Sequence, residues 1–199
     1  MLKKLFSALT VAFCLASPTS AQENVKKLPA PQTSGGIPLM EAVQKRHSAR
    51  EFSAEKIDDQ TLSDILYAAW GISHDGKRTV PTSMNKQNLA VYAVMPDGAW
   101  LYDAGGNRLI QVTAEDLRPL FDRQDYMKDA QLTLVFTGTD PRNSPLHAGS
   151  AYQNVGLYAA SRGLNNVVRG WFDRDVVAKA LNLKPEEVII SQTIGWPYK

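Results

Sequence analysis

The stretch NLAVYAVMPDGAWLYDAGGNRLIQV, residues 88–112, decides the class of fold. Two short runs within it, Pro96-Asp97-Gly98 and Gly105-Gly106-Asn107, are typical of tight turns. The residues between the turns are mostly apolar, β-branched or aromatic, which favours strands. The stretch therefore predicts a three-stranded meander, with strands over 88–95, 100–102 and 109–112.

The rest of the chain interleaves helices and strands without a regular βαβ alternation. Apolar residues at helical spacing, with Asp58 or Asp59 as a cap and Gly71 and Gly163 as stops, predict helices. The helices are expected to begin at Pro38, to run from Asp59 towards Gly71, and to cover 116–121, 147–162 and 173–181. Apolar runs predict further strands, the first of them buried on both faces, over 132–137, 167–168 and 188–194. This order indicates an α+β domain.

The first 21 residues have the pattern of a secretory signal peptide. Met1–Lys4 is basic, Leu5–Ala16 is an apolar run, and Ser17–Ala21 contains small residues suited to a cleavage site. The apolar run is shorter than the roughly 20 residues that a membrane span requires. An N-terminal core helix is the alternative, but the run has no amphipathic period. We therefore expect export to the periplasm or the cell exterior, without stable membrane insertion.

Removal of residues 1–21 changes the chemistry of the remaining chain. It takes away Cys14, the single cysteine, so neither a disulfide nor a thiol nucleophile is expected. A lipoprotein attachment site at Cys14 is the alternative, although Phe13 fits that pattern poorly. Loss of Lys3 and Lys4 reduces the 22 basic residues to 20, which equals the 20 acidic residues. This balance argues against a nucleic-acid partner, which requires a basic surface.

Residues 22–37 are rich in Pro, Lys, Gln, Ser and Gly and show no apolar period. This composition predicts a flexible linker between the cleavage site and the fold. A single domain is then expected over residues 38–199, with enough apolar residues for a packed core.

Signatures of catalysis by side chains are scarce. The sequence contains no GxSxG, GxxxxGK[ST], HExxH or GxGxxG motif. Its three histidines, His47, His74 and His147, lack metal-ligand spacing, so no metal site is expected. No side chain is therefore singled out as catalytic.

The run Arg46-His-Ser-Ala-Arg-Glu-Phe52 follows the first predicted helix. Arg46 and Arg50 carry permanent charges whose planar donor groups match phosphate oxygens, and Ser48 adds a hydroxyl. The alternative is that the arginines complement the dipole of the helix C-terminus and bond its last carbonyls. From these residues alone, the alternative is favoured.

The run Arg78-Thr-Val-Pro-Thr-Ser-Met-Asn-Lys-Gln87 leads into the strand over 88–95. Short hydrogen-bonding side chains on a loop beside a rigid strand suit the polar edge of a ligand. An ordinary polar loop is the alternative, because Pro, Ser and Asn also favour turns. Taken alone, this run favours the ordinary loop.

Together the two runs resemble motifs of the nitroreductase family. In that family the first motif runs R-R-S-x-R-x-F and the second P-S-x-x-N-x-Q-P, matched here by Arg46–Phe52 and Pro81–Gln87. Three later features follow in the family's order: a hairpin similar to that of the dehydrogenase-like branch with SagB-type enzymes, a long helix with a G-L stop, and a closing G-x-P. These are Asp97–Asp103, Ala148–Asn154 with Gly163-Leu164, and Ile194–Pro197. The resemblance spans residues 38–199.

The resemblance implies a nitroreductase-like fold, in which helices flank a central, mainly antiparallel sheet. It also implies an intertwined homodimer with FMN at its interface, passing hydride between an electron donor and a small-molecule substrate. The first run would bind the phosphate and the pyrimidine edge of the ring, and the second would come from the other subunit. Two further residues would lie near flavin N5. The full implied set is Arg46, His47, Ser48, Arg50, Pro81, Thr82, Ser83, Asn85, Gly170 and Trp171.

Three departures from the family pattern bear on the activity. Thr82 replaces the usual Ser, Arg169-Gly170-Trp171 stands where classical members often have Glu-Gly, and many relatives have a basic arm beyond the position of Lys199. A tryptophan beside the flavin would narrow the substrate cleft. This departure and export both argue against NAD(P)H as the electron donor. A SagB-like dehydrogenase acting on a small or peptide substrate, and a flavin- or ligand-binding protein without turnover, are the alternatives.

Overall fold

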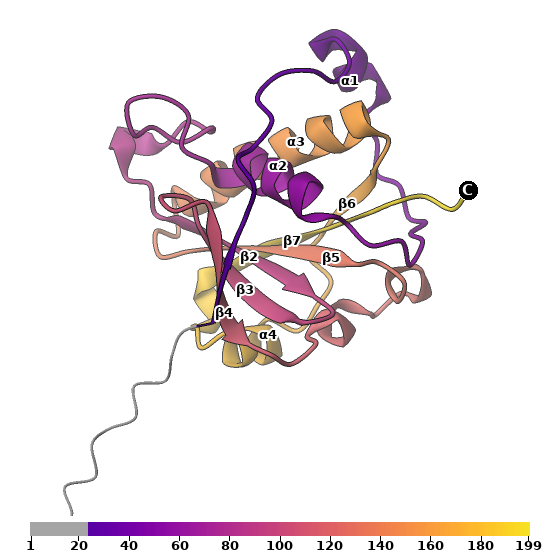
Figure 1. Cartoon of the computed structure of the whole chain (residues 1–199). Coiled ribbons are helices and arrows are strands. Elements are labelled where there is room, and N and C mark those ends of the chain that lie inside the picture. Colours follow the sequence, from indigo (N-terminus) through magenta and orange to yellow (C-terminus); the bar gives the residue numbers. More distant parts are fainter. Residues whose placement is uncertain (1–23) are drawn as a thin grey trace, which may run out of the picture.

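The computed structural model of the protein describes residues 24–199 (Figure 1), so the expected signal peptide over 1–21 lies outside the described residues. Seven strands form one sheet in the order β1-β4-β3-β2-β5-β7-β6, each antiparallel to its neighbours. The expected α+β class and antiparallel sheet are confirmed. The strands are β1 Val25–Lys27, β2 Leu89–Met95, β3 Gly98–Asp103, β4 Arg108–Thr113, β5 Leu132–Gly138, β6 Asn165–Arg169 and β7 Val188–Gly195.

Helices cover both faces of this sheet. Figure 1 shows α2 and α3 on one face and α4 on the other, with α1 packed on α3 farther from the sheet. Among residues 24–199, no helix is long and apolar enough to cross a membrane. The helices are α1 Leu39–Lys45, α2 Asp59–Trp70, α3 Ser144–Arg162 and α4 Arg174–Ala180, with short 3-10 turns at η1 Ser83–Asn85, η2 Arg118–Phe121, η3 Asp125–Met127 and η4 Pro185–Glu187.

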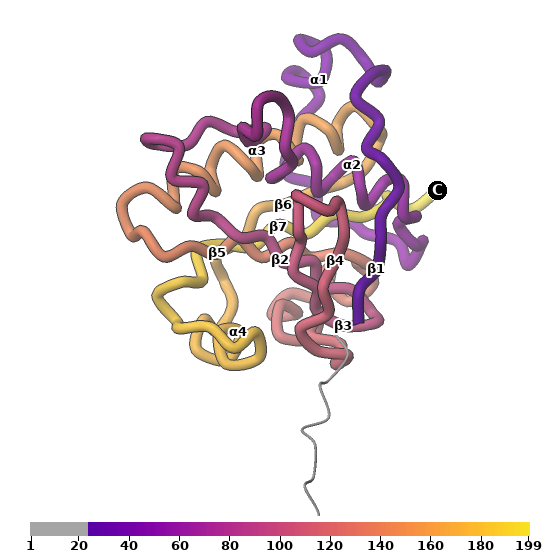
Figure 2. Tube along the Cα trace, turned by 60° about the vertical axis from the view of Figure 1, so that its left-hand side comes forward, coloured from indigo at the N-terminus to yellow at the C-terminus, as the bar shows by residue number. Residues whose placement is uncertain are grey.

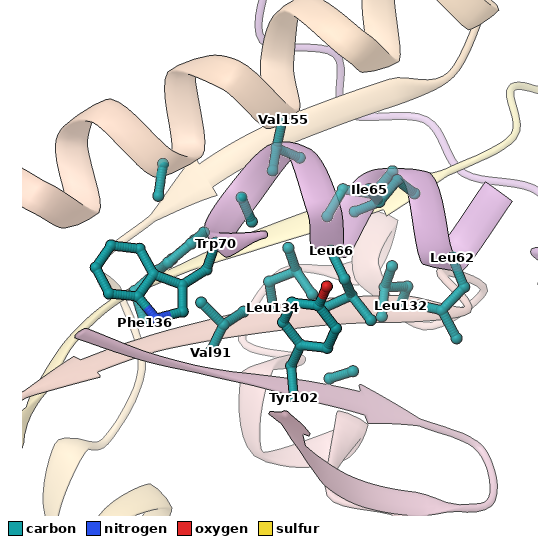
Figure 3. Close-up of a cluster of buried hydrophobic side chains, with 14 of the residues drawn as sticks. Leu62, Ile65, Leu66, Trp70, Val91, Tyr102, Leu132, Leu134, Phe136 and Val155 are labelled. Carbon is teal, nitrogen blue, oxygen red and sulfur yellow. The ribbon is translucent and has the colours of Figure 1, made fainter. Parts of the chain in front are cut away.

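The larger part of the core lies between α2 and the sheet. Asp58 begins the helix, because its carboxylate accepts the Thr61 N–H at 2.7 Å and so satisfies a free donor of the first turn. The apolar spacing then buries Leu62, Ile65 and Leu66, and Figure 3 shows Leu62 and Leu66 on the face that points toward β5. Burial of each such side chain contributes about 1.5–3 kcal/mol.

Strand β5 lies between β2 and β7 near the middle of the sheet. All of its residues from Leu132 to Thr137 are buried, as the uninterrupted apolar run predicts. One face packs under α2 and α3; the other face packs against a second cluster beneath α4, which includes Phe121, Val135, Phe172 and Val177. Burial on both faces makes β5 the centre of the fold.

Helix α3 is the longest element of the described part of the chain and passes both predicted ligand-binding runs. Its buried positions Ala148, Ala151, Val155 and Ala159 form the stripe that packs on the sheet and α2. It ends at Gly163, whose φ of 75° is left-handed and favours glycine. The chain then turns directly into β6.

The prediction of a flexible linker over residues 22–37 is wrong for much of the part that the structure describes. Val25–Lys27 pairs with β4 as an edge strand, and the chain then runs over α2 (Figure 2). The Ser63 hydroxyl donates to Pro29 O at 2.6 Å, Gln60 Nε2 to Ala30 O at 3.0 Å, and Gln32 N–H to Asp64 Oδ1 at 2.8 Å. These bonds satisfy an extended backbone without any apolar period, so the sequence pattern does not show them.

The helix expected over 116–121 is instead the shorter turn η2. The Asp116 carboxylate accepts the backbone N–H of Arg118 at 3.0 Å and pairs with its guanidinium at 2.7 Å. Such local bonds compete with the helical ladder and favour a turn.

Candidate functional site

The first predicted run leaves α1 in an extended conformation and crosses α3. Its backbone is tied to β6 by the Ala49 N–H, which donates to Asn166 O at 3.0 Å. The stem of Arg46 lies against Gly156 of α3, where an added Cβ would be 3.2 Å from Arg46 Cδ. The missing side chain at Gly156 therefore makes room for this arginine. The C-terminus of α1, α3 and β6 meet at this point.

The guanidinium groups of Arg46 and Arg50 have no partner within residues 24–199. Neither donates a hydrogen bond there nor pairs with a carboxylate, and the Ser48 hydroxyl is likewise unbonded. The bond to the last carbonyl of α1 is made by His47, whose Nδ1–H donates to Lys45 O at 2.8 Å. The two arginines thus present unpaired cations at the surface.

The second predicted run forms a loop with an unusual backbone. Met84 and Asn85 have φ values of 50° and 56°, a left-handed region that residues other than glycine rarely adopt. The Gln87 amide donates to Asn85 Oδ1 at 3.0 Å and to Gly76 O at 3.1 Å. Pro81, Thr82 and Asn85 line an open pocket of about 550 Å³ beside this loop. Non-glycine strain of this kind is typical of ligand-binding positions.

Arg78 anchors the start of this loop. Its Nε donates to Gln87 Oε1 at 2.8 Å, its Nη1 donates to Trp70 O at 3.1 Å, and Cζ lies 4.8 Å from the centre of the Trp70 ring. Burial lowers the pKa of the Arg78 guanidinium below its ordinary value. An arginine remains charged at neutral pH, so these contacts persist and hold both ends of the loop together.

His147 contacts the same loop, although the sequence patterns did not select it as a site residue. The residue is 3% exposed, and Nε2 of its ring accepts the backbone N–H of Ser83 at 2.9 Å. A weak signal was present, because His147 shares the four-residue spacing of the buried Ala151, Val155 and Ala159. A polar ring on the buried face of a helix requires a hydrogen-bond partner.

No hydrogen bond or ion pair joins the two runs within residues 24–199. The second run contacts α3 at Asn154, through Thr79 O, and at His147, through the Ser83 N–H, whereas the first run contacts it at Gly156. Along the helix axis, the Ser83 and Arg46 contacts are about 13 Å apart, at about 1.5 Å per residue.

Gly170 and Trp171 follow β6 directly. A Cβ at Gly170 would meet nothing within 4 Å, and the Trp171 side chain is 59% exposed. The flanking residues are buried: Arg169 donates to Phe121 O at 2.6 Å, and the Phe172 ring lies 5.3 Å from that of Phe121. The buried Arg169 and Phe172 thus fix the backbone on both sides of the exposed Gly170 and Trp171.

The polar groups near Arg46 suit an anionic ligand with a polar edge. The two unpaired guanidinium groups and the free hydroxyl of Ser48 are hydrogen-bond donors. Gly170, which follows the far end of β6, presents a backbone without a side chain. The carbonyl oxygen of the buried Gln192 side chain, whose amide donates to Asn166 at 3.1 Å, has no donor. Among the described residues, no group of three or more His, Cys, Asp or Glu side chains could hold a metal.

The fold and these two runs define the chain as an α+β protein of the nitroreductase class. The family model described as the nitroreductase family matches residues 43–196. A solved structure from Ralstonia eutropha JMP134, provisionally named a nitroreductase, is 34% identical in sequence to this chain. It superposes with a TM-score of 0.82, and the match covers 99% of this chain and 97% of that one. The chain therefore belongs to the nitroreductase family.

Two more distant structures share the fold. A subunit of the E. coli microcin synthetase complex, solved with truncated pro-MccB17, is 19% identical with a TM-score of 0.66 and covers 94% of this chain and 85% of its own. A provisionally named nitroreductase from Desulfovibrio desulfuricans, solved in complex with FMN, is 20% identical with a TM-score of 0.60. It covers 83% of this chain and 89% of its own.

Proposed function

We propose that this protein is an oxidoreductase that binds FMN without a covalent bond and passes hydride through it between an electron donor and a small molecule. The observation that carries the proposal is that the guanidinium groups of Arg46 and Arg50, where α1, α3 and β6 meet, have no bonding partner within residues 24–199. Family membership and the FMN complex of the Desulfovibrio relative support it.

The working unit in this proposal is a homodimer. The two runs make no bond to each other within residues 24–199, which supports a site that a second protomer completes. Three exposed apolar side chains of α1, 66% for Leu39, 73% for Met40 and 46% for Val43, offer a surface for that contact. In the dimer, Pro81, Thr82, Ser83 and Asn85 of one protomer face Arg46, His47, Ser48 and Arg50 of the other.

The chain's own residues would bind and orient the cofactor. Arg46, Arg50 and Ser48 would hold the phosphate and the pyrimidine edge, where a guanidinium stabilises negative charge. The backbone N–H groups of Gly170 and Trp171 would orient flavin N5 without reorganising during transfer. FMN, when bound, supplies the hydride chemistry, so no catalytic side chain is required.

A dehydrogenase of the SagB type is the second candidate. The sequence Asp97–Asp103 in the hairpin β2–β3 resembles that branch, which supports this candidate, and the microcin synthetase subunit has the same fold. In this candidate, a small or peptide substrate gives hydride to FMN. The exposed Trp171 would narrow access to the ring and favour a flat substrate. A flavin-binding protein without turnover is the remaining alternative.

Export belongs to the proposal as well. Residues 1–21 would direct the chain to the periplasm or the cell exterior, where nicotinamide cofactors are scarce. An electron donor other than NAD(P)H follows from that location.

Expression of the full chain, including residues 1–21, tests the proposal. We expect a yellow mature protein that begins within a few residues of position 22 and releases FMN on heating. Anaerobic NADH or NADPH should leave the flavin oxidised. A colourless protein that takes up no added FMN would contradict the cofactor, whereas rapid bleaching by NADH would favour an ordinary nitroreductase.

Arginine variants test the site itself. Arg46→Ala and Arg50→Ala should each weaken FMN binding by about 10-fold to 100-fold, since a charge-assisted bond contributes about 1.5–3 kcal/mol. Arg108→Ala, which removes an exposed arginine of β4 that pairs with Asp103 at 2.7 Å, is the control. Full retention of FMN in both site variants would show that the phosphate assignment is wrong.

A further inference from the structure

The His147 imidazole joins α3 to the loop that carries Pro81–Asn85. Nε2 accepts the Ser83 N–H at 2.9 Å, and Nδ1 lies 3.1 Å from Asn88 Oδ1. A backbone N–H can only donate, so Nε2 carries no proton and the Nδ1–H donates to Asn88. One neutral tautomer therefore satisfies both bonds.

Ser83 is the first residue of the strained turn. The left-handed φ values of Met84 and Asn85 follow it immediately. Strain of this kind persists only where the surrounding contacts hold the backbone in place. The Met84 side chain is 80% exposed, so its own packing does not supply that restraint.

Backbone bonds from the Asn85 N–H to Thr82 O and from the Lys86 N–H to Ser83 O form the turn, and three side-chain contacts hold it in the described structure. Gln87 bonds Asn85 from within the loop, whereas His147 bonds Ser83 from α3. The Lys86 and Asp140 side chains pair at 3.7 Å on the exposed side, where solvent weakens such a bond. The His147 bond is thus the buried link between this turn and the rigid core.

We propose that His147 is a positioning residue for the FMN site. It fixes the backbone of Thr82–Asn85 in the conformation that meets the cofactor of the opposite protomer, and it touches no ligand itself. This inference rests on the proposed function, because it concerns the same site.

Three variants separate positioning from general stability. His147→Leu removes both bonds, whereas His147→Gln keeps a side-chain oxygen that can accept the Ser83 N–H. Tyr158→Phe is the matched control: it removes one bond of α3, from the Tyr158 hydroxyl to Asp64 Oδ2 at 3.1 Å, eleven residues further along the helix. Each full chain is measured for the FMN dissociation constant by flavin fluorescence, for Ser83 amide exchange without flavin, and for Tm.

We expect His147→Leu to weaken FMN binding by about 10-fold or more, the size of one lost buried hydrogen bond. Its Ser83 amide should exchange faster by a similar factor. His147→Gln should restore both quantities at least in part, and Tyr158→Phe should change Tm but neither of them.

The outcomes distinguish this inference from the proposed function. A wild-type chain that binds no FMN overturns both. If wild type binds FMN and His147→Leu binds it equally well, only the role of His147 is wrong. The inference would also be wrong if His147→Leu and Tyr158→Phe lost FMN affinity equally, in proportion to the decrease in Tm. If His147→Leu does not fold, Asn88→Leu removes the Nδ1 partner alone and should give a smaller loss of FMN affinity; an unchanged affinity would overturn the inference.

Discussion

Arg46 crosses α3 at Gly156, so closely that a Cβ on the glycine would lie 3.2 Å from Arg46 Cδ and 3.3 Å from Arg46 Cγ. Glycine inside a helix costs about 1 kcal/mol relative to alanine. The helix bears this cost at the point where an unpaired guanidinium is held beside β6. This contact links the helix sequence to the proposed cofactor site.

Gly156→Ala is expected to separate stability from binding. The new methyl group should displace Arg46 and weaken FMN binding about 10-fold. The helix should meanwhile gain up to about 1 kcal/mol in propensity. Flavin titration and thermal unfolding of the same preparation measure the two effects.

Gly149→Ala is the matched control on the same helix. A Cβ there has only ordinary contact with Tyr152, the nearest atom being 3.7 Å away. We expect the same propensity gain and unchanged FMN affinity. If both alanine variants bind FMN as wild type does, Gly156 does not set the position of Arg46.

Leu39→Asp tests the dimer. A charge at this exposed position of α1 should destabilise an apolar interface and shift the protein to monomers, with loss of FMN. Light scattering after size-exclusion chromatography measures the mass. Val176→Asp on α4, where the side chain is 44% exposed, should leave both mass and FMN unchanged. A monomeric wild type with bound FMN would contradict the two-protomer site.

Asp58→Ala removes the N-cap of α2 and should cost about 0.5–2 kcal/mol of unfolding free energy at neutral pH. The Thr61 backbone N–H holds the pKa of Asp58 below its ordinary value. A depressed pKa contributes stability above the unfolded-state value, and this contribution is lost as pH falls through the folded-state value. Urea unfolding across the acidic range should show the difference between wild type and variant shrinking. A difference that stays constant down to the lowest pH would contradict the charged cap.

Leu66→Ala creates a cavity between α2 and β5. Leu66 is fully buried, so we expect a loss of about 2–5 kcal/mol in unfolding free energy. Val176→Ala, at a partly exposed position, should cost far less. Denaturant unfolding compares the two, and equal costs would mean that the α2 face is not the main core.

Much of the fold could be predicted because its signals are local. The turn residues between β2, β3 and β4 stand beside the strands that they join, and Gly163 ends α3 where its left-handed φ requires glycine. The structure of residues 25–32 could not be predicted, because a three-residue edge strand and three side-chain bonds leave no hydrophobic period in the sequence.

For the candidate site, sequence patterns selected the two runs but not His147. The helical spacing of His147 indicates only a buried position, and the fold alone places its ring against Ser83, 64 residues away. This contact depends on the packing of α3 beside the loop, which the spacing within the helix does not encode.

The sequence by itself determined the strands of the meander, the end of the long helix at Gly163 and the two motif runs, because turn chemistry and hydrophobic period act over a few residues. Only the tertiary structure decided that β5 lies between β2 and β7, that Gly156 receives Arg46, and that His147 contacts Ser83. These facts depend on which distant surfaces fit together, and complementary packing between distant segments has no signature in either segment alone.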